Sequence, residues 1–260
     1  LLGIMTATDS LNHRSFNDRP PRHLFQTPWH GVGGFRFDEQ VAHVFPDMIR
    51  RSVPGYGQVI GLSALIAKRY AQPHTHLYDL GCSLGATTLA VAEQVTEPGC
   101  RVIAIDNSQA MLDRARGLSA DRLIDPLPID WVQADITDYR FEPASVMAMN
   151  FTLQFIDPTL RADLIGRIYE ALTPGGVFVL AEKVVLEAPD AQAILTDLHH
   201  DFKRANGYSE LEIASKRQAI ETVLIPETSE THQERLRQAG FSQVIECFHC
   251  LNFKAWVSLK

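Results

Sequence analysis

THLYDLGCSLGATTLAVAEQV, residues 75–95, joins an apolar segment, a glycine-containing turn and a segment of helical pattern in direct succession. We predict a strand over 75–80, a turn over 81–85 and a helix from residue 86. Gly81 follows the strand directly and permits a tight turn there. A glycine turn between a strand and a helix indicates nucleotide binding only within a wider βαβ context, so the flanking sequence decides what this turn means.

The sequence downstream repeats the alternation of strand and helix. Strands are predicted for RVIAID (101–106), PIDWVQAD (128–135), ASVMAMNF (144–151) and VFVLAEK (177–183). Ser108 can cap a helix after the second strand, and Asp157 with Pro158 begins another helix after the fourth. Strands that alternate with helices form βαβ units, so we expect an α/β protein with a mostly parallel sheet.

The segment before this core predicts an arm and a lid. Residues 1–34 are polar and lack periodicity, which is typical of a flexible arm, and we expect one domain over 35–260. Helices are predicted over 37–45, with Asp38 as the cap and Pro46 as an interruption, and over 58–70. Together they would form a helical lid over 35–72.

The segment after the core departs from the alternation. Residues 186–225 are polar with a helical pattern and predict an insertion after the fifth strand. Residues 231–241 predict an amphipathic helix that stops at Gly240. Residues 242–260 predict two closely joined strands, which would form a hairpin at the edge of the sheet.

Composition limits the classes of function. The chain has 260 residues, 45% of them hydrophobic, and a formal net charge of -7. This acidic balance argues against broad nucleic-acid binding, which needs clustered Lys and Arg, but it allows a local basic pocket for a small anion. Four sparse cysteines without a secretory signal indicate a reduced, cytoplasmic location. No apolar run reaches membrane-spanning length.

The glycine turn fits a dinucleotide fingerprint poorly. Against G-x-G-x-x-G, Gly81 matches, but Ser83 and Ala86 stand at the second and third glycine positions. The second glycine lets the backbone approach a pyrophosphate, so a side chain there favours a ligand without one. S-adenosyl-L-methionine (SAM) is such a ligand. A dinucleotide remains an alternative, and Asp79 and Asp106 could also be no more than strand-end caps.

DLGCSLG resembles the acidic-x-Gly-x-x-x-Gly turn of class I SAM-dependent methyltransferases. The resemblance implies a Rossmann-like sheet of seven mostly parallel strands with an antiparallel last strand and helices on both faces. It implies that Asp106 binds the ribose hydroxyls and that Asn150 faces the reaction centre. The other cofactor-binding residues that it implies are Gly81, Cys82, Ser83, Asn107, Asp135 and Ile136. As a side chain, Cys82 is expected to be a small packing residue of the turn and not a reactive thiol.

Two local clusters suggest metal binding, but neither has suitable spacing. CFHC (247–250) places Cys247 and Cys250 on opposite faces of a strand, without a second ligand pair nearby in sequence. His199, His200 and Asp201 are adjacent on a helix, and adjacent helical residues do not face one site, so a capped or solvated helix surface is expected there. We therefore expect no metal.

A closer resemblance covers residue 35 to the end. VFPDMIRRSVPGY, YDLGCSLGATTL, AIDNSQAM, NFTLQF and HHDFKRANGYSELEIASKR are similar to segments of the carboxy-S-adenosyl-L-methionine synthase family. That family converts SAM and prephenate into carboxy-SAM and phenylpyruvate, and a partner enzyme uses carboxy-SAM to modify the wobble uridine of tRNA. The resemblance implies that no protein base is required, because a hydroxide or carboxylate released from prephenate can take the methyl proton.

The same resemblance assigns residues outside the glycine turn. It implies that Arg217 holds the carboxylate of carboxy-SAM, from the other subunit of a homodimer, and is the catalytic residue. Tyr56 would contact SAM from the lid. Arg204 and Tyr208 are placed in the prephenate pocket from their position alone. Guanidinium groups suit carboxylates because they bind both oxygens in one plane.

Three alternatives stay open at this point. The protein could be a conventional methyltransferase acting on a small carboxylic acid, since fold does not fix function. It could bind SAM without turnover. The basic stretch KRANGYSELEIASKR (203–217) could be a solvated helical face, which is the usual fate of a run of charges.

Overall fold

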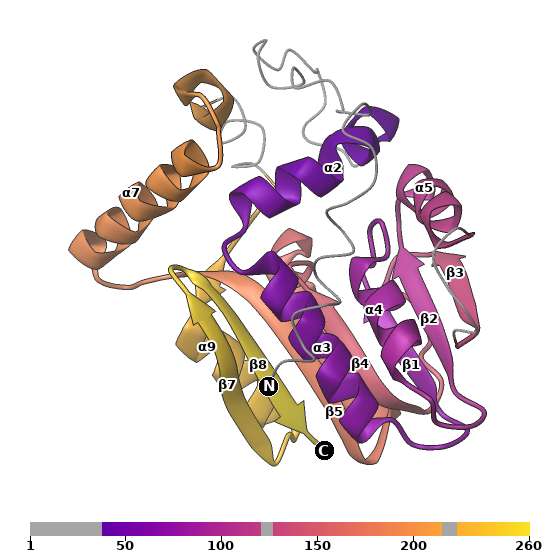
Figure 1. Ribbon diagram of the computed structural model, residues 1–260. Coiled ribbons are helices and arrows are strands. Elements are labelled where there is room, and N and C mark those ends of the chain that lie inside the picture. The colour runs from indigo at the N-terminus through magenta and orange to yellow at the C-terminus, as the bar shows by residue number, and fades with distance from the viewer. Residues whose placement is uncertain (1–37, 121–126, 215–222) are drawn as a thin grey trace, which may run out of the picture.

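The computed structural model describes residues 38–120, 127–214 and 223–260 (Figure 1). The arm over 1–34 and Arg217 therefore lie outside the described residues. The elements follow one another as α2 (Glu39–Ser52), α3 (Tyr56–Tyr70), β1 (His76–Leu80), α4 (Ala86–Gln94), β2 (Arg101–Asp106), α5 (Gln109–Ala120), β3 (Ile129–Gln133), β4 (Ala144–Asn150), η1 (Leu153–Phe155), α6 (Pro158–Ala171), β5 (Leu172–Val185), α7 (Pro189–Ala205), β6 (Glu227–Thr228), α9 (Ser229–Ala239), β7 (Gln243–Cys250) and β8 (Phe253–Leu259).

The sheet has the topology expected from the strand–helix alternation. Its strands lie in the order β3-β2-β1-β4-β5-β8-β7, and the short β6 pairs with β5 outside this path. Strands β1 to β5 are parallel, whereas β8 runs antiparallel to both β5 and β7. The seven-stranded sheet with an antiparallel last strand and the hairpin at its edge are confirmed. The addition is β6, the eighth strand.

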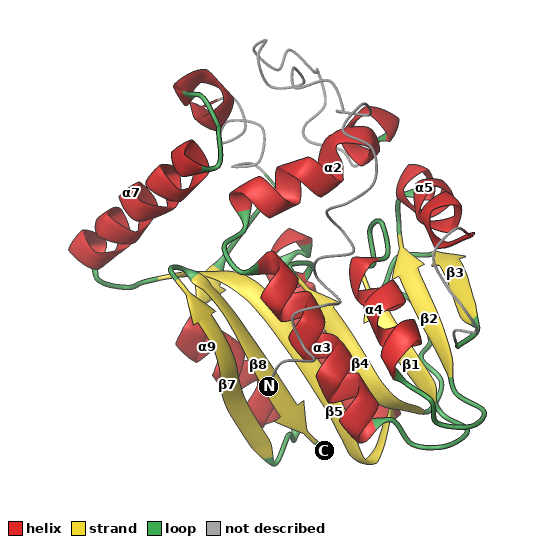
Figure 2. Cartoon of the chain, viewed as in Figure 1, coloured by secondary structure: helices red, strands yellow, loops and turns green. Residues whose placement is uncertain are grey.

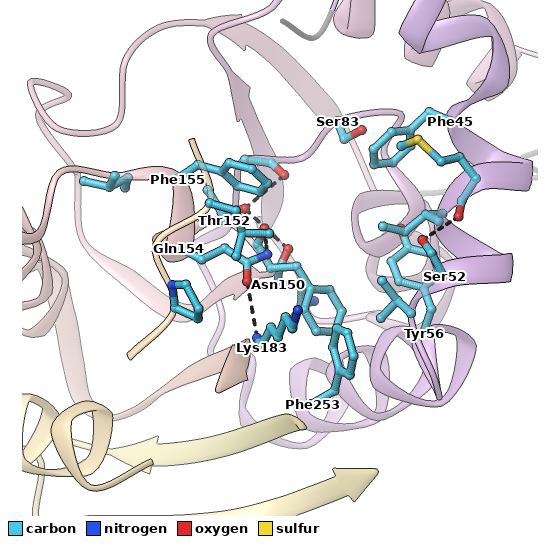
Figure 3. Close-up of a pocket in the computed structure, with 18 of the residues that line it drawn as sticks. Phe45, Ser52, Tyr56, Ser83, Asn150, Thr152, Gln154, Phe155, Lys183 and Phe253 are labelled. Atoms are coloured by element: carbon cyan, nitrogen blue, oxygen red, sulfur yellow. Dashed lines mark hydrogen bonds between the residues drawn. The ribbon is translucent and has the colours of Figure 1, made fainter. Parts of the chain in front are cut away.

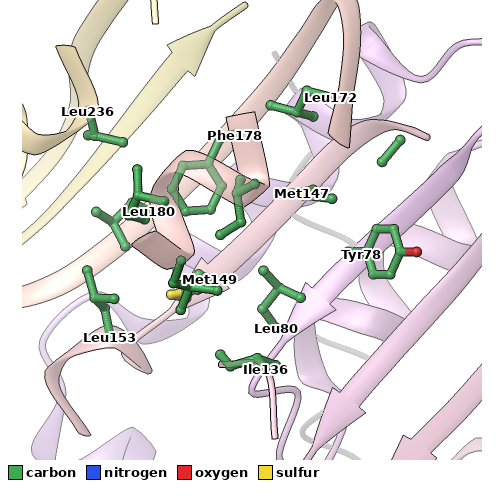
Figure 4. Close-up of a cluster of buried hydrophobic side chains, with 14 of the residues drawn as sticks. Tyr78, Leu80, Ile136, Met147, Met149, Leu153, Leu172, Phe178, Leu180 and Leu236 are labelled. Carbon is green, nitrogen blue, oxygen red and sulfur yellow. The ribbon is translucent and has the colours of Figure 1, made fainter. Parts of the chain in front are cut away.

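Helices cover both faces of this sheet (Figure 2). Apolar residues of α3 and α4 pack on one face, in a cluster that includes Ala67, Val91 and Val102. Residues of α6 and α9 pack on the other face, where Leu164 and Leu236 belong to the largest buried cluster (Figure 4). A parallel sheet buried on both faces needs apolar residues at successive positions, which explains why β4 is buried from its first residue almost to its end.

Helix α2 differs from the sequence prediction at Pro46. Asp38 caps the helix as expected, because its side chain accepts a hydrogen bond from the Val41 N–H. The helix continues through Pro46 and ends at Ser52, so the predicted interruption is wrong. A proline inside a helix costs about 3 kcal/mol. Burial of one large apolar side chain contributes roughly 1.5–3 kcal/mol, and Phe45 and Met48 are among several that α2 buries.

Helices α2 and α7 lie beyond the carboxyl ends of the strands (Figure 1), and hydrogen bonds join α2 to the turn after α7. In α2, Arg51 donates from Nε to the Asn206 carbonyl at 2.7 Å and from Nη2 to the Gly207 carbonyl at 2.5 Å. Its guanidinium also lies 4.3 Å from the ring centroid of Tyr208. We call these interactions the α2–α7 contact. These interactions join α2 to the end of α7 and the turn that follows it, and we call this part of the molecule the cover.

Candidate active site

A cavity of about 630 Å³ lies between this cover and the carboxyl ends of β1 to β5 (Figure 3). Open parallel sheets bind ligands at this edge, and the volume lies within the range of roughly 300–1,000 Å³ that is usual for small-molecule sites. Nine of the ten predicted cofactor-binding residues line the cavity, and the tenth, Arg217, lies outside the described residues. The nine are Tyr56, Gly81, Cys82, Ser83, Asp106, Asn107, Asp135, Ile136 and Asn150.

The turn after β1 is tightly packed. Gly81 has φ 76°, a left-handed conformation that favours glycine. A Cβ atom at this position would overlap the side chain of Thr152, which follows β4. Ser83 also adopts a positive φ of 51°, which is uncommon for a residue with a side chain. The turn therefore brings the backbone close to the β4 loop and turns the Ser83 N–H toward β2.

Asp106 accepts a hydrogen bond from the Ser83 N–H and so stabilises the turn. Its Oδ2 accepts from Ser83 N at 2.8 Å, and its Oδ1 accepts from Ser108 N at 2.9 Å. Burial raises the pKa of Asp106, and these two hydrogen bonds oppose the rise. Ser108 in turn caps α5 as predicted, since its Oγ accepts from Met111 N at 3.2 Å. A carboxylate held from one side retains acceptor capacity toward the cavity.

Asp79, at the end of β1, has both a capping position and a cavity position. Its Oδ2 accepts from the Thr88 N–H at 2.9 Å and from the Thr88 hydroxyl at 2.5 Å, in the first turn of α4. Burial raises the pKa of this carboxyl to about 6, with a further contribution from the nearby charge of Asp106. The alternative that Asp79 caps a helix is thus confirmed. Asp79 and Asp106 nevertheless also line the cavity.

Asn150 is the last residue of β4, and hydrogen bonds fix the NH₂ group of its side-chain amide. Its Nδ2 donates to Ser63 Oγ at 3.1 Å and to Thr87 Oγ1 at 3.0 Å, which belong to α3 and α4. Its Oδ1 is buried and has no hydrogen-bond partner among the described residues. A buried acceptor without a partner is costly, so a ligand donor in this cavity would relieve the cost.

Glu182 anchors the loop after β4 through hydrogen bonds to its backbone. The carboxyl oxygens of this fully buried residue accept hydrogen bonds from the N–H groups of Thr152, Leu153 and Gln154. Burial raises its pKa to about 8 in spite of these three hydrogen bonds. Thr152 and Gln154 both line the cavity. Glu182 therefore fixes one wall of the cavity from the opposite face of the sheet.

Aromatic rings form the wall on the lid side. The ring centroids of Tyr56 and Phe151 are 6.1 Å apart, and those of Phe151 and Phe253 are 6.0 Å apart. His199 of α7 continues the row at 5.1 Å from Phe253. All four line the cavity. Burial raises the pKa of Tyr56, so its hydroxyl stays protonated at neutral pH.

The placement of the insertion residues corrects the sequence analysis. Arg204 is exposed and pairs with Glu210 and Asp201 instead of lining the cavity. Tyr208 is buried, and its hydroxyl donates to the Met48 carbonyl at 3.3 Å. Neither residue lines the cavity, so the prediction that they form the prephenate pocket is wrong. Arg204 lies on the exposed side of α7, where it meets Asp201 and Glu210. Tyr208 follows the end of α7 and packs against α2.

Other basic residues face the cavity instead. They are Lys183 of β5 and His199, His200 and Lys203 of α7. The expected solvated surface is wrong for His199 and Lys203, which are buried. The carboxyl-end rule could have identified Lys183, because it closes the predicted fifth strand. His199, His200 and Lys203 face the cavity because of the rotation of α7 about its own axis, and nothing in the sequence fixes that rotation.

The metal interpretation has no support in the described part of the chain. No group of three or more His, Cys, Asp or Glu residues there has an arrangement that could hold a metal ion. Cys247 and Cys250 are both free cysteines.

Comparison with solved structures shows the class of fold. A putative SAM-dependent methyltransferase from Methanococcus maripaludis superposes with a TM-score of 0.56 at 21% identity, over 88% of this chain and 96% of that one. Human N-acetylserotonin methyltransferase gives a TM-score of 0.56 at 18% identity, over 86% and 56%. A family described as a methyltransferase domain matches residues 77–176. The chain therefore has the Rossmann-like fold of these SAM-dependent methyltransferases.

Relatives at higher identity define the family. The carboxy-S-adenosyl-L-methionine synthase of Trichlorobacter lovleyi is 52% identical over 91% of this chain and 97% of its own length. That of Pseudomonas putida is 54% identical over 93% and 99%. The protein belongs to the carboxy-S-adenosyl-L-methionine synthase family.

Proposed function

We propose that this protein converts SAM into carboxy-SAM with prephenate as the second substrate and phenylpyruvate as the second product. Relatives named for carboxy-SAM synthesis, at 52–54% identity over more than nine-tenths of the chain, carry this proposal. The cavity at the carboxyl ends of the strands supports it, because the residues expected at a SAM site line it together.

The binding roles follow from the chemistry of the cavity wall. Asp106 offers carboxylate oxygens to the ribose hydroxyls, and Asp135 and Asn107 lie at the adenine end. SAM has a sulfonium and an ammonium, so the carboxylates of Asp79 and Asp106 attract it. Asn150 presents its buried Oδ1 to a donor of the methionine part. Tyr56 closes the site from the lid.

The reaction balances without a protein base. Prephenate loses carbon dioxide and hydroxide and becomes phenylpyruvate. The hydroxide removes a proton from the SAM methyl group, which gives water and a sulfonium ylide. The ylide carbon then forms a bond to carbon dioxide, and the product carries a carboxylate beside the sulfonium. The cavity walls keep carbon dioxide next to the ylide until the bond forms.

Arg217 completes this site in the proposal. A guanidinium is the group that best binds the new carboxylate, because it offers two parallel donors. We propose that it acts from the second subunit of a homodimer. Exposed apolar residues on the insertion support a dimer: Ile194 and Leu198 lie one turn apart on α7 with 60% and 45% exposure, and Leu211 has 50%. Such side chains are typical of an interface when they lie together.

The cellular role follows from the product. Carboxy-SAM would serve a partner enzyme that modifies the tRNA wobble uridine in the cytoplasm. The net charge of -7 does not favour direct binding of nucleic acid by this chain. In the described part of the chain, every helix is too short or too polar to cross a bilayer.

Mass spectrometry after incubation with SAM and prephenate tests the proposal. We expect a species equal to SAM plus one carbon dioxide, and its formation should depend on prephenate. Production of S-adenosylhomocysteine with a carboxylic-acid acceptor, and no carboxylated SAM, would instead establish the alternative of a conventional methyltransferase. Bound SAM without turnover under either condition would indicate a binding protein.

A further inference from the structure

The cavity is divided by charge. Three carboxylates, Asp79, Asp106 and Asp135, lie at the carboxyl ends of β1, β2 and β3. A fourth, Asp157, lies at the start of α6, where its Oδ1 accepts from the N–H and hydroxyl of Thr159. The lysines and histidines of the lining all come from β5 and α7. A cation such as SAM fits the acidic end, so the basic end is suited to a different, anionic molecule.

Strand register places Lys183 next to the boundary between these two ends. Asn150 pairs with Ala181 across β4 and β5, and Lys183 lies two residues further along β5. Two residues of a strand span about 6.5–7 Å, and residues two apart share a face of the sheet. Ala181 packs with Val59 and Phe253 on the lid side, so Lys183 belongs to that same side. Lys183 therefore lies on the cavity side of the sheet, two residues beyond the position on β5 that pairs with Asn150.

The neighbours of Lys183 fix its backbone and offer an apolar surface. Its N–H donates to Gln154 Oε1 at 3.4 Å, and its strand partner across β5 and β8 is Phe253. Figure 3 shows Lys183 between Gln154 and Phe253 in the cavity wall. The rings of Phe151, Phe253 and His199 form a continuous row there. A row of aromatic faces beside an ammonium fits a ligand that combines a ring with a carboxylate.

We propose that Lys183 is the principal carboxylate-binding residue of a second-substrate subsite, with the ring of that substrate against Phe253 and Phe151. The substrate class is a cyclic organic acid with two carboxylates. Lys203 and His200 of α7 face the same end of the cavity and receive the second carboxylate. This inference rests on the proposed function, because it assigns the prephenate of that reaction to defined residues.

The subsite also explains how the reacting groups meet. Lys183 lies two residues beyond the β5 partner of Asn150, and Asn150 faces the methyl end of SAM in the proposed arrangement, so a carboxylate held by Lys183 is near that end. Carbon dioxide released from that substrate would then form beside the ylide carbon. Holding two reactants in one geometry is a large source of rate enhancement. Lys183 thus acts by positioning a substrate and needs to accept no proton.

The test is a steady-state comparison of Lys183→Met with the full-length protein. Methionine keeps most of the side-chain length and removes the charge. We expect the KM for prephenate to rise roughly 10- to 100-fold, because a hydrogen bond to a charged group is lost. The Kd for SAM, measured by calorimetry, should stay within about twofold, which also shows that the variant is folded. Lys183→Arg should recover part of the prephenate affinity.

Lys68→Met is the matched control. Lys68 lies on α3, is exposed and does not line the cavity, so its variant should keep both constants. A second variant, Phe253→Leu, should also raise the KM for prephenate while SAM binding is retained.

The outcomes separate this inference from the proposed function. If the wild-type protein forms no carboxy-SAM from prephenate, the proposed function fails. If the wild type is active and Lys183→Met has an unchanged KM for prephenate, the function stands and the subsite is overturned. A loss of kcat alone, with unchanged KM, would also overturn the binding role of Lys183.

Discussion

At the scale of single residues, the site uses the same carboxylates for structure and for ligand binding. Asp79 caps α4 through Thr88, and Asp106 orders the glycine turn through Ser83 and Ser108. Both also line the cavity. A sequence can show the position of such residues at strand ends, but their burial, and so their pKa, depends on the surrounding fold.

Asp79 should make SAM binding depend on pH. Its pKa is raised to about 6 by burial, so the group is neutral below that value and ionised above it. SAM is cationic and favours the ionised form, so its Kd should fall as the pH rises from 5 to 7.5. Each unit by which SAM lowers this pKa corresponds to about a tenfold gain in affinity. Calorimetry across this range should give a flatter profile for Asp79→Asn.

The same shift affects stability in the opposite direction. Because the folded pKa lies above the unfolded value of 3.8, the folded state binds the proton more tightly. The contribution of Asp79 to the free energy of unfolding is therefore largest below pH 3.8 and is lost as the pH rises through 6. Urea unfolding of the wild type and Asp79→Asn should show this difference, and equal pH slopes would contradict it.

Gly81→Ala should damage both stability and binding. The left-handed φ of 76° penalises a side chain by roughly 1–2 kcal/mol, and the added Cβ would also overlap Thr152. We expect a lower Tm and a weaker Kd for SAM. Gly57→Ala is the matched control, since a Cβ there meets no atom within 4 Å. Equal effects of the two substitutions would show that the turn tolerates a side chain.

At the scale of elements, the notable feature is the union of α2 with α7. These helices are far apart in sequence, yet Arg51 of α2 donates hydrogen bonds to the Asn206 and Gly207 carbonyls in the turn directly after α7. His199 Nε2 also lies 2.8 Å from the Ser52 carbonyl. The lid that contributes Tyr56 and the insertion that contributes Lys203 are therefore positioned by each other. Helical segments at both places are predicted from the sequence, but the contact between them is not.

Arg51→Ala should loosen this cover. Two hydrogen bonds to the turn after α7, the ion pair with Asp47 and the contact with the Tyr208 ring are lost, at a cost of about 1–3 kcal/mol. We expect faster proteolysis of the segment around α7 and a higher KM for both substrates. Arg50→Ala is the control, because Arg50 is 72% exposed and pairs only with Asp47 among the described residues. Proteolysis at the same rate in both variants would show that the α2–α7 contact does not hold the cover.

At the scale of the whole molecule, the proposed dimer can be tested by complementation. Arg217→Ala should bind SAM but form no carboxy-SAM, and Asp106→Ala should bind SAM more weakly. If Arg217 acts across the dimer, mixing the two variants creates one site with both residues intact, and part of the activity returns. No recovery in mixtures that do exchange subunits, as shown by native mass spectrometry, would place Arg217 in its own subunit's site.

The sequence alone determined the sheet and the acidic half of the cavity. The strand and helix periods are local properties, and the carboxyl ends of parallel strands meet at one edge, so the sequence predicts that Gly81, Asp106, Asp135 and Asn150 lie close together. The predicted break at Pro46 was wrong because burial of the apolar face of α2 outweighs one missing hydrogen bond.

Only the tertiary structure decided the basic half. Whether Arg204 or Lys203 faces the cavity depends on the rotation of α7, and that rotation is set by contacts with α2 more than 140 residues earlier, such as His199 with Ser52, 147 positions apart. Neighbouring side chains on one helix point about 100° apart, so a rotation of that size would exchange a cavity residue for an exposed one. Local pattern has no information about such a rotation, because its energy comes from residues distant in the chain.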